Sequence, residues 1–300
     1  MKHAAFIAQA LSTPWALQRE VLAAYAGVLV RKYSGLAAHE GGDIAAEHIN
    51  AAAPGRSNVN RSGSIAVVPL FGTVMQRSGM MEMCGGGTSV QRFTSAFREA
   101  MADETISQIL IEIDSPGGSV YGVSELFNEV YSARSNKPVV AIANSLAASA
   151  AYWVGCAASE FYVTPGGEVG SIGVWQAHED WSSALEEEGI KTTLISAGKY
   201  KVEGNPYEPL SEDAQSFMQS RVNDYYGAFT KAVSKGRNVP MDAVRNGMGQ
   251  GRVLGADAAL TEKMVDGIAT MDEVIKKMSR NARTGRSALK AAQAELSILG

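Results

Sequence analysis

The chain has 300 residues, of which 46% are hydrophobic and 19% charged, so it can bury a sizeable core as one large domain with or without appendages. Its net charge of −4, without a basic stripe of interleaved aromatic residues, argues against a nucleic-acid partner. The two cysteines, Cys84 and Cys156, are too few for a disulfide framework and indicate free thiols in a reducing compartment.

The N-terminal residues 1–50 are Ala-rich and predict a helical extension. Within them, residues 15–30 carry apolar side chains at helical intervals, which predicts an amphipathic helix. Polar residues and Pro14 interrupt the apolar stretch before it, so we expect no signal peptide. The sequence has no apolar run near ~18 residues, so no membrane span is expected. Residues 51–63 are rich in Pro, Gly and Ser and predict a linker.

Strands and helices alternate over residues 64–278. The predicted strands span residues 65–70, 106–113, 138–143, 161–163, 172–174 and 192–196. The predicted helices span residues 89–102, 120–130, 150–158, 182–188 and 211–235, and a last helix and strand fall within 255–268. This alternation predicts an α/β fold of repeated βαβ units with a mostly parallel sheet. Residues 279–300 are basic and predict a helical or flexible tail, more typical of a solvated tail than of a nucleic-acid arm.

Two turns at the ends of predicted strands carry residues suited to acyl transfer. Ser149 lies between a predicted strand and a predicted helix, and Gly117 and Gly118 follow another strand. Sites in parallel sheets gather at the carboxyl ends of strands, so we expect these turns to lie close together. The Gly-Gly backbone can point amides at an anion, and a serine hydroxyl can act as a nucleophile once a base accepts its proton.

The sequence patterns leave open which residue accepts the proton of the Ser149 hydroxyl. His178 is the one histidine within residues 64–278, and it is a possible triad base or simply a hydrogen-bonded side chain. Lys199 and Lys201 are the alternatives, and they should face opposite sides of an extended segment. A lysine, with a free pKa of ~10.4, serves as a base near neutrality only where desolvation lowers that pKa.

Four motifs occur here in an order that resembles the S49 peptidases, the signal peptide peptidase A-like serine proteases with a ClpP/crotonase-like fold. They are Asp114–Gly118, Ala148-Ser149 with Tyr152, Gly170–Val174 and Ser196–Lys201. The resemblance covers roughly residues 63–272 and implies that residues 64–278 form the peptidase domain.

The resemblance also implies the site residues. It implies a catalytic dyad of Ser149 and Lys201, rather than Lys199, with Ser171 orienting the lysine amine without adding charge. The implied oxyanion hole uses the amides of Gly117 or Gly118 and of Ala150. The family usually has Gly-Gly after the nucleophile where this chain has Ala150-Ala151; alanine makes positive φ costly there, so we expect an ordinary helical start. No metal and no cofactor are implied.

Within the family, the chain most resembles the capsid assembly proteases of tailed phages. The segment Lys201–Tyr207 and the pair Ala177-His178 carry this likeness. It implies a serine endopeptidase that processes scaffold, portal or capsid precursors inside the procapsid, in the host cytoplasm. It also implies a homo-oligomer, a tetrameric or octameric ring, with neither a nucleic-acid partner nor a membrane span.

Three other functions stay open from the sequence. The first is a bacterial peptidase of the same family that degrades cleaved signal peptides. The second is a non-proteolytic acyl-CoA enzyme with a crotonase-like fold, in which a Ser149/Lys201 pair has no purpose. The third is an inactive family member that serves as an assembly factor, against which the intact catalytic residues argue.

Overall fold

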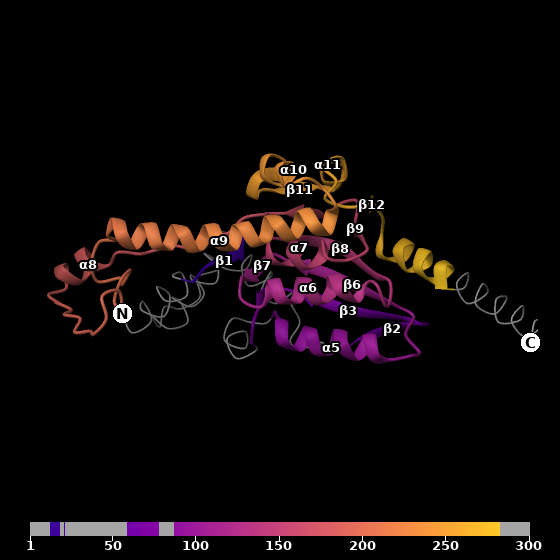
Figure 1. Cartoon of the computed structure of the whole chain (residues 1–300), viewed down its shortest axis with the longest axis horizontal. Helices are drawn as coiled ribbons and strands as arrows, with labels where there is room; N and C mark the ends of the chain where they lie inside the picture. Colours follow the sequence, from indigo (N-terminus) through magenta and orange to yellow (C-terminus); the bar gives the residue numbers. More distant parts are fainter. Residues whose placement is uncertain (1–12, 19–20, 22–58, 78–86, 283–300) are drawn as a thin grey trace, which may run out of the picture.

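The computed structural model describes residues 13–18, 21, 59–77 and 87–282 (Figure 1). The strands are β1 (Trp15–Leu17), β2 (Asn60–Ser62), β3 (Ile65–Phe71), β4 (Val74–Met75), β5 (Thr88–Ser89), β6 (Gln108–Ser115), β7 (Gly117–Ser119), β8 (Val139–Ala148), β9 (Glu160–Val163), β10 (Glu168–Gly170), β11 (Val253–Gly255) and β12 (Gly267–Ile268). The helices are α5 (Val90–Ala102), α6 (Val123–Ala133), α7 (Ala150–Gly155), α8 (Ser182–Glu187), α9 (Glu212–Arg237), α10 (Met241–Asn246) and α11 (Ala256–Thr261), with a 3-10 turn at Met248–Gly251. Residues 271–282 are also helical and are called the C-terminal helix below.

The central sheet is mixed and mostly parallel. Its strand order is β11-β10-β8-β6-β3-β2, with β9 paired to β8 and β12 paired to β9. The inner pairings are parallel, whereas β2 and β11 run antiparallel at the two edges. Because α5, α6 and α7 connect successive parallel strands, the predicted α/β architecture of βαβ units with a mostly parallel sheet is confirmed.

Strand β8 is the place where the sheet divides. Its first half, from Val140 to Ala143, pairs with β9, and its last three residues, Leu146 to Ala148, pair with β10. On its other side β8 pairs with β6. Ser149, the residue after β8, therefore follows a strand that is paired with β10 on one side and with β6 on the other.

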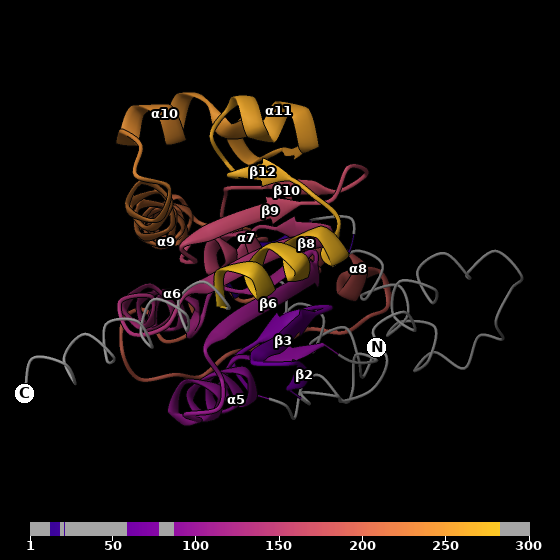
Figure 2. The same ribbon diagram turned by 90° about the vertical axis from the view of Figure 1, so that its right-hand side faces the viewer.

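Helices cover both faces of the sheet. On one face α5, α6, α7 and α9 enclose the larger core, in which Trp153 stacks on Phe229 with ring centroids 4.5 Å apart. On the opposite face the C-terminal helix buries Val274 and Met278 against strand residues. Figure 2 shows this helix in front of the sheet. Both faces are apolar, which explains why the inner strands read as nearly continuous hydrophobic runs.

A second, smaller sheet lies beside the first, with the order β1-β7-β4-β5. Strand β7 is its second member, antiparallel to β1 and parallel to β4. The Gly-Gly turn thus becomes a short strand held between two neighbours.

Residues 182–210, which include α8, are called the arm. The arm and the N-terminal half of α9 extend away from the central sheet (Figure 1). The arm is tied at its base, where the Trp181 amide donates to the Pro206 carbonyl at 2.8 Å. None of its residues is buried.

Several predicted elements differ from the structure. Residues 15–17 form strand β1 rather than a helix, because their backbone pairs with β7, and residues 60–62 of the predicted linker form β2. Residues 172–174 are not a strand, since positive φ at Gly170 (127°) and Ser171 (53°) turns the chain out of the ladder. Residues 192–196 are exposed in the arm and are not a strand, and they pair with none of the strands that the structure describes.

The remaining predicted elements of the core match observed ones within a few residues, including Ser211 as the N-cap of α9. Most of residues 1–63, and the tail beyond residue 282, lie outside the described residues. Among the described helices, α9 included, there is no apolar stretch long enough to cross a bilayer.

A partly buried ion pair between Arg237 and Asp266 joins the end of α9 to β9. The Arg237 guanidinium donates to both carboxylate oxygens of Asp266 at 2.8 Å, and the Phe161 amide donates to the same carboxylate at 2.7 Å. Burial acts to raise the pKa of Asp266, but hydrogen bonding and charge from Arg237 outweigh it and hold the pKa below its usual value. The Arg237 side chain is 5% exposed and that of Asp266 39%.

We expect Arg237→Ala to lower the free energy of unfolding by about 1–3 kcal/mol, between the values for exposed and for buried ion pairs, because Asp266 is partly solvated. A depressed carboxyl pKa stabilises the fold above the unfolded-state value and loses that contribution as pH falls through the folded value. The difference between variant and wild type should therefore shrink in acid, which urea titrations at pH 7 and pH 3 would measure. Arg98→Ala, which removes the solvent-exposed pair with Glu129, is the matched control and should change little.

Candidate active site

Ser149 occupies the sharp turn between β8 and α7. Its backbone has φ 54° and ψ −116°, a conformation that costs a non-glycine residue energy and persists where the surroundings impose it. The Ser149 amide donates to the Gly170 carbonyl at 2.7 Å, and its carbonyl accepts from the Trp153 amide at 2.9 Å. One bond fixes the serine to β10 and the other starts α7, so the side chain is presented at the carboxyl end of the sheet.

The two alanines after Ser149 begin α7 without strain. Ala150 and Ala151 are fully buried, and neither has a positive φ. The unusual φ falls on Ser149 itself, which explains how alanine is accommodated where the family usually has glycine.

Gly117 and Gly118 of β7 lie next to Ser149. Gly117 has φ 100°, and a Cβ there would stand 2.9 Å from the Ser149 Cβ and 2.3 Å from the Ala16 carbonyl oxygen. A Cβ on Gly118 would stand 1.8 Å from the Val74 carbonyl oxygen. Both positions therefore require glycine. At Gly117 there is no room for a side chain between the backbone of β7 and the side chain of Ser149.

The amide of Gly117 has a partner in this structure. It donates to the Ser115 hydroxyl oxygen at 3.2 Å, and that hydroxyl donates to the Gly72 carbonyl at 2.6 Å. At 3.2 Å, the bond from the Gly117 amide is at the long end of the ordinary range for N–H···O bonds.

A cavity of about 500 Å³ opens at this turn. Ser149 and Ser171 both line it, and the Ser171 amide is fixed by a 2.8 Å bond to the Arg252 carbonyl. The remaining lining residues are Leu17, Gln18, Gly173, Val174, Trp175, Gly251, Arg252 and Val253. The structure thus brings together all the predicted site residues except the lysine.

Lys201 lies on the exposed arm and does not line this cavity. Lys199 also lies there, with its amine 4.7 Å from the centre of the Tyr200 ring. Because the arm extends away from the central sheet (Figure 1), one chain does not place either amine beside its own Ser149.

The other candidate bases and nucleophiles fall elsewhere. The Nε2 atom of His178 is hydrogen-bonded to the Asn205 carbonyl at 2.9 Å, a contact within the base of the arm. Cys156 is fully buried, and burial raises the pKa of its thiol to about 12, so it is no nucleophile near neutrality. Cys84 and the three N-terminal histidines lie outside the described residues.

Two contributors to the site were not predicted. Trp175, just beyond the Gly170–Val174 motif, and the strand β1 both border the cavity. The spacing of residues 15–30 favoured a helix, and the pairing of β1 depends on residues about 100 positions away in the sequence. Within the described parts of the chain, no three His, Cys, Asp or Glu side chains gather in the manner of a metal site.

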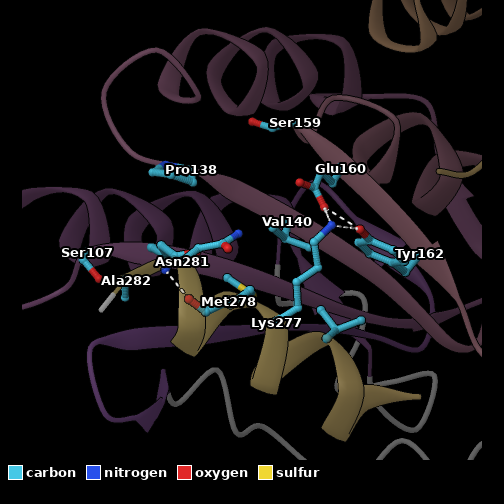
Figure 3. Close-up of a pocket in the computed structure, with 12 residues that line it drawn as sticks. Ser107, Pro138, Val140, Ser159, Glu160, Tyr162, Lys277, Met278, Asn281 and Ala282 are labelled. Atoms are coloured by element: carbon cyan, nitrogen blue, oxygen red, sulfur yellow. Dashed lines mark hydrogen bonds and ion pairs between the residues drawn. The ribbon is translucent and has the colours of Figure 1, made fainter. Parts of the chain in front are cut away.

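A second cavity, of about 440 Å³, lies under the C-terminal helix and shares no lining residue with the first (Figure 3). The Lys277 amine donates to the Glu160 carboxylate at 2.6 Å and contacts the Tyr162 hydroxyl. This cluster holds the helix against β9, and the cavity contains none of the predicted site residues.

The sequence is similar to known peptidases. The model of "Peptidase family S49" matches residues 132–284. The Head-tail preconnector protein GP5 of Enterobacteria phage P21 is 32% identical over 224 residues, which is 74% of this chain and 44% of that protein. Capsid assembly protease C of Escherichia phage lambda is 36% identical over 170 residues, 57% of this chain and 39% of that protein.

A bacterial relative extends the comparison. The Putative signal peptide peptidase SppA of Enterococcus faecium is 25% identical over 194 residues, 64% of this chain and 56% of that protein. The chain thus spans between two fifths and three fifths of the length of these relatives. The family match covers half of the chain and includes Ser149, the arm and all the lining residues of the cavity except Leu17 and Gln18. The chain belongs to peptidase family S49.

Proposed function

We propose that this chain is a serine endopeptidase with Ser149 as the nucleophile and Lys201 as the general base. The observation that carries the proposal is the position of Ser149, on a strained turn beside the glycine strand β7 and in the lining of a cavity. Family membership supports proteolysis as the reaction. We further propose that the domain has the ClpP/crotonase-like form of the α/β fold.

In the proposed reaction the Ser149 oxygen attacks the scissile carbonyl carbon while Lys201 accepts the hydroxyl proton. The amides of Ala150 and of Gly117 or Gly118 stabilise the negative oxygen of the tetrahedral intermediate. Lys201 returns the proton to the leaving amine, and an acyl-serine ester remains. Water then attacks the ester carbon while Lys201 accepts a water proton. Lys201 gives this proton to the Ser149 oxygen as the acyl–oxygen bond breaks, and the carboxylic acid is released.

We propose that Lys201 reaches a serine of another copy. The arm carries several exposed apolar side chains, among them Leu194 (41%), Ile195 (97%) and, on α9 beside it, Phe217 (55%). Apolar surface of this kind is typical of a contact with a partner. In a ring of copies, the arm of one chain would bring its lysine to the cavity of the next, where Ser171 would accept a hydrogen bond from the amine.

The proposed substrates are scaffold, portal or capsid precursors of a phage procapsid. The support is the likeness to a phage protein named a capsid assembly protease and to another named a head-tail preconnector protein. The second candidate is a bacterial peptidase acting on signal peptides, which the likeness to a putative signal peptide peptidase supports. Mass spectrometry of coexpressed capsid precursors, with wild-type chain and with Ser149→Ala, separates these two.

Active-site labelling tests the nucleophile directly. A fluorophosphonate probe should label the assembled protein at Ser149, as located by peptide mapping, and the label should be absent in Ser149→Ala. Labelling at another residue, or equal labelling of the variant, would refute the assignment of Ser149.

A further inference from the structure

The strand β1 is hydrogen-bonded along both of its edges. On one edge it pairs antiparallel with β7, and Ala16 is opposite Gly118. On the other edge the Trp15 amide donates to the Trp175 carbonyl at 2.9 Å, and the Trp175 amide donates to the Trp15 carbonyl at 3.0 Å. An extended segment held between two other segments of backbone has the geometry of strand addition, the mode by which many proteins bind peptides.

The pairing with β7 engages an amide of the proposed oxyanion hole. The Gln18 amide donates to the Pro116 carbonyl at 3.2 Å. Hydrogen-bonded pairs recur at every second residue of an antiparallel ladder, so the next such pair is Ala16 with Gly118. The Ala16 carbonyl therefore lies at the Gly118 amide, where a substrate carbonyl is expected.

The same segment lies directly beside Ser149. A Cβ atom added to Gly117 would lie 2.3 Å from the Ala16 carbonyl oxygen and 2.9 Å from the Ser149 Cβ, so both residues are next to Gly117. Leu17 and Gln18 line the cavity together with Ser149. The backbone of β1 thus fills the space that a peptide must enter to reach the serine.

Side chains hold β1 in this place. Trp15 and Leu17 are 4% and 2% exposed and pack with Met75 and Trp175. The indole Nε1 of Trp175 donates to the Leu17 carbonyl at 2.8 Å. Ala16 between them is fully buried, so this position of the groove admits a small side chain.

We propose that β1 is a tethered occupant of the substrate groove. A substrate would be an extended peptide that replaces β1 in the same pairing, with a small residue at the position of Ala16. This inference rests on the proposed function, because it takes Ser149 as the reacting group. A segment tethered to its own groove competes with substrate at an effective concentration of ~1 mM, so the chain restrains its own proteolysis.

A reversible disulfide tests this occupancy. Trp15 and Ser119 are opposite each other at a non-hydrogen-bonded position, where Cα atoms lie ~4.5 Å apart and can be bridged. The test protein is the full chain with Trp15→Cys and Ser119→Cys. Cys84→Ser removes a competing thiol, while Cys156 is buried. Ser149→Ala is added so that binding is measured without turnover.

The probe is a fluorescein-labelled peptide with the sequence of residues 13–18, and its binding is followed by fluorescence anisotropy. The oxidised protein, with β1 locked in the groove, should bind the probe at least about tenfold more weakly than the protein reduced with dithiothreitol. A probe with phenylalanine at the position of Ala16 should bind the reduced protein at least about tenfold more weakly than the alanine probe, because that position is fully enclosed.

Equal affinity of the oxidised and reduced forms, with the cross-link verified by mass spectrometry, overturns the proposal. Failure of the cross-link to form contradicts the register on which it depends. Trp15→Cys alone, in the same background, is the matched control and should show no redox dependence. Because the assay involves no turnover, an inactive wild-type chain would refute the proposed peptidase and leave the binding result standing.

Discussion

Replacing Ser149 by alanine is expected to lower the rate of peptide hydrolysis by on the order of 10⁴-fold or more, since a catalytic serine and its base act as a unit. The physical reason is the loss of the attacking oxygen. Alanine keeps the buried volume of the turn nearly unchanged, so the fold should persist. Initial rates with a fluorogenic peptide, compared with thermal unfolding of the same samples, measure the two effects separately.

Ser145→Ala is the matched control for this experiment. Ser145 lies on β8, the strand that leads to Ser149, also has a positive φ (147°), and does not line the cavity. The control should retain near-normal hydrolysis. Comparable loss in both variants would show that the strand had been disturbed rather than the nucleophile removed. Substantial hydrolysis by Ser149→Ala would exclude Ser149 as the nucleophile.

The second large effect concerns which copy of the chain supplies Lys201 to a given Ser149. Lys201→Ala alone should lose on the order of 10³-fold or more in hydrolysis, like other losses of a catalytic base. When subunits of Ser149→Ala and Lys201→Ala are dissociated, mixed in equal amounts and reassembled, activity should return. If each site combines the serine of one copy with the lysine of its neighbour, random mixing restores about a quarter of the wild-type sites.

Lys199→Ala serves as the control, because that lysine lies on the same arm and should be dispensable. Lys199→Ala copies keep both Ser149 and Lys201. A mixture of Ser149→Ala with Lys199→Ala should therefore show the activity expected from the serines of the Lys199→Ala copies. An absence of recovery in the mixture of Ser149→Ala with Lys201→Ala, with mixed oligomers verified by native mass spectrometry, would show that both groups act within one chain. Loss of activity in Lys199→Ala but not in Lys201→Ala would reassign the base.

The turn that carries Ser149 could be predicted from the sequence because its signals are local. A β-branched run before Ser149 and small residues after it predict a strand and a helix, and both are found. Gly117 and Gly118 are similarly marked by the preceding strand and by Pro116. Parallel strands bring such turns to one edge of a sheet, so their proximity followed from the fold class.

The parts that could not be predicted depend on distant partners. Residues 15–17 have a helical pattern, yet their backbone is satisfied by β7 and Trp175. The pattern of residues 192–196 suggests a strand, but in the arm none of the described strands pairs with them. Lys201 was assigned from a family motif, and a motif carries no information about which copy of a chain supplies the group. In each case the deciding interaction is absent from the local sequence.

The distance between the arm and the serine of its own chain has a consequence for timing. Under the proposed pairing of copies, a solitary molecule is inert, and turnover rises more steeply than in proportion to the number of molecules present. Dilution would separate the copies and abolish proteolysis, and confinement at high concentration would restore it, without a dedicated activator. Local density, rather than a chemical signal, would then decide when precursor chains are cut.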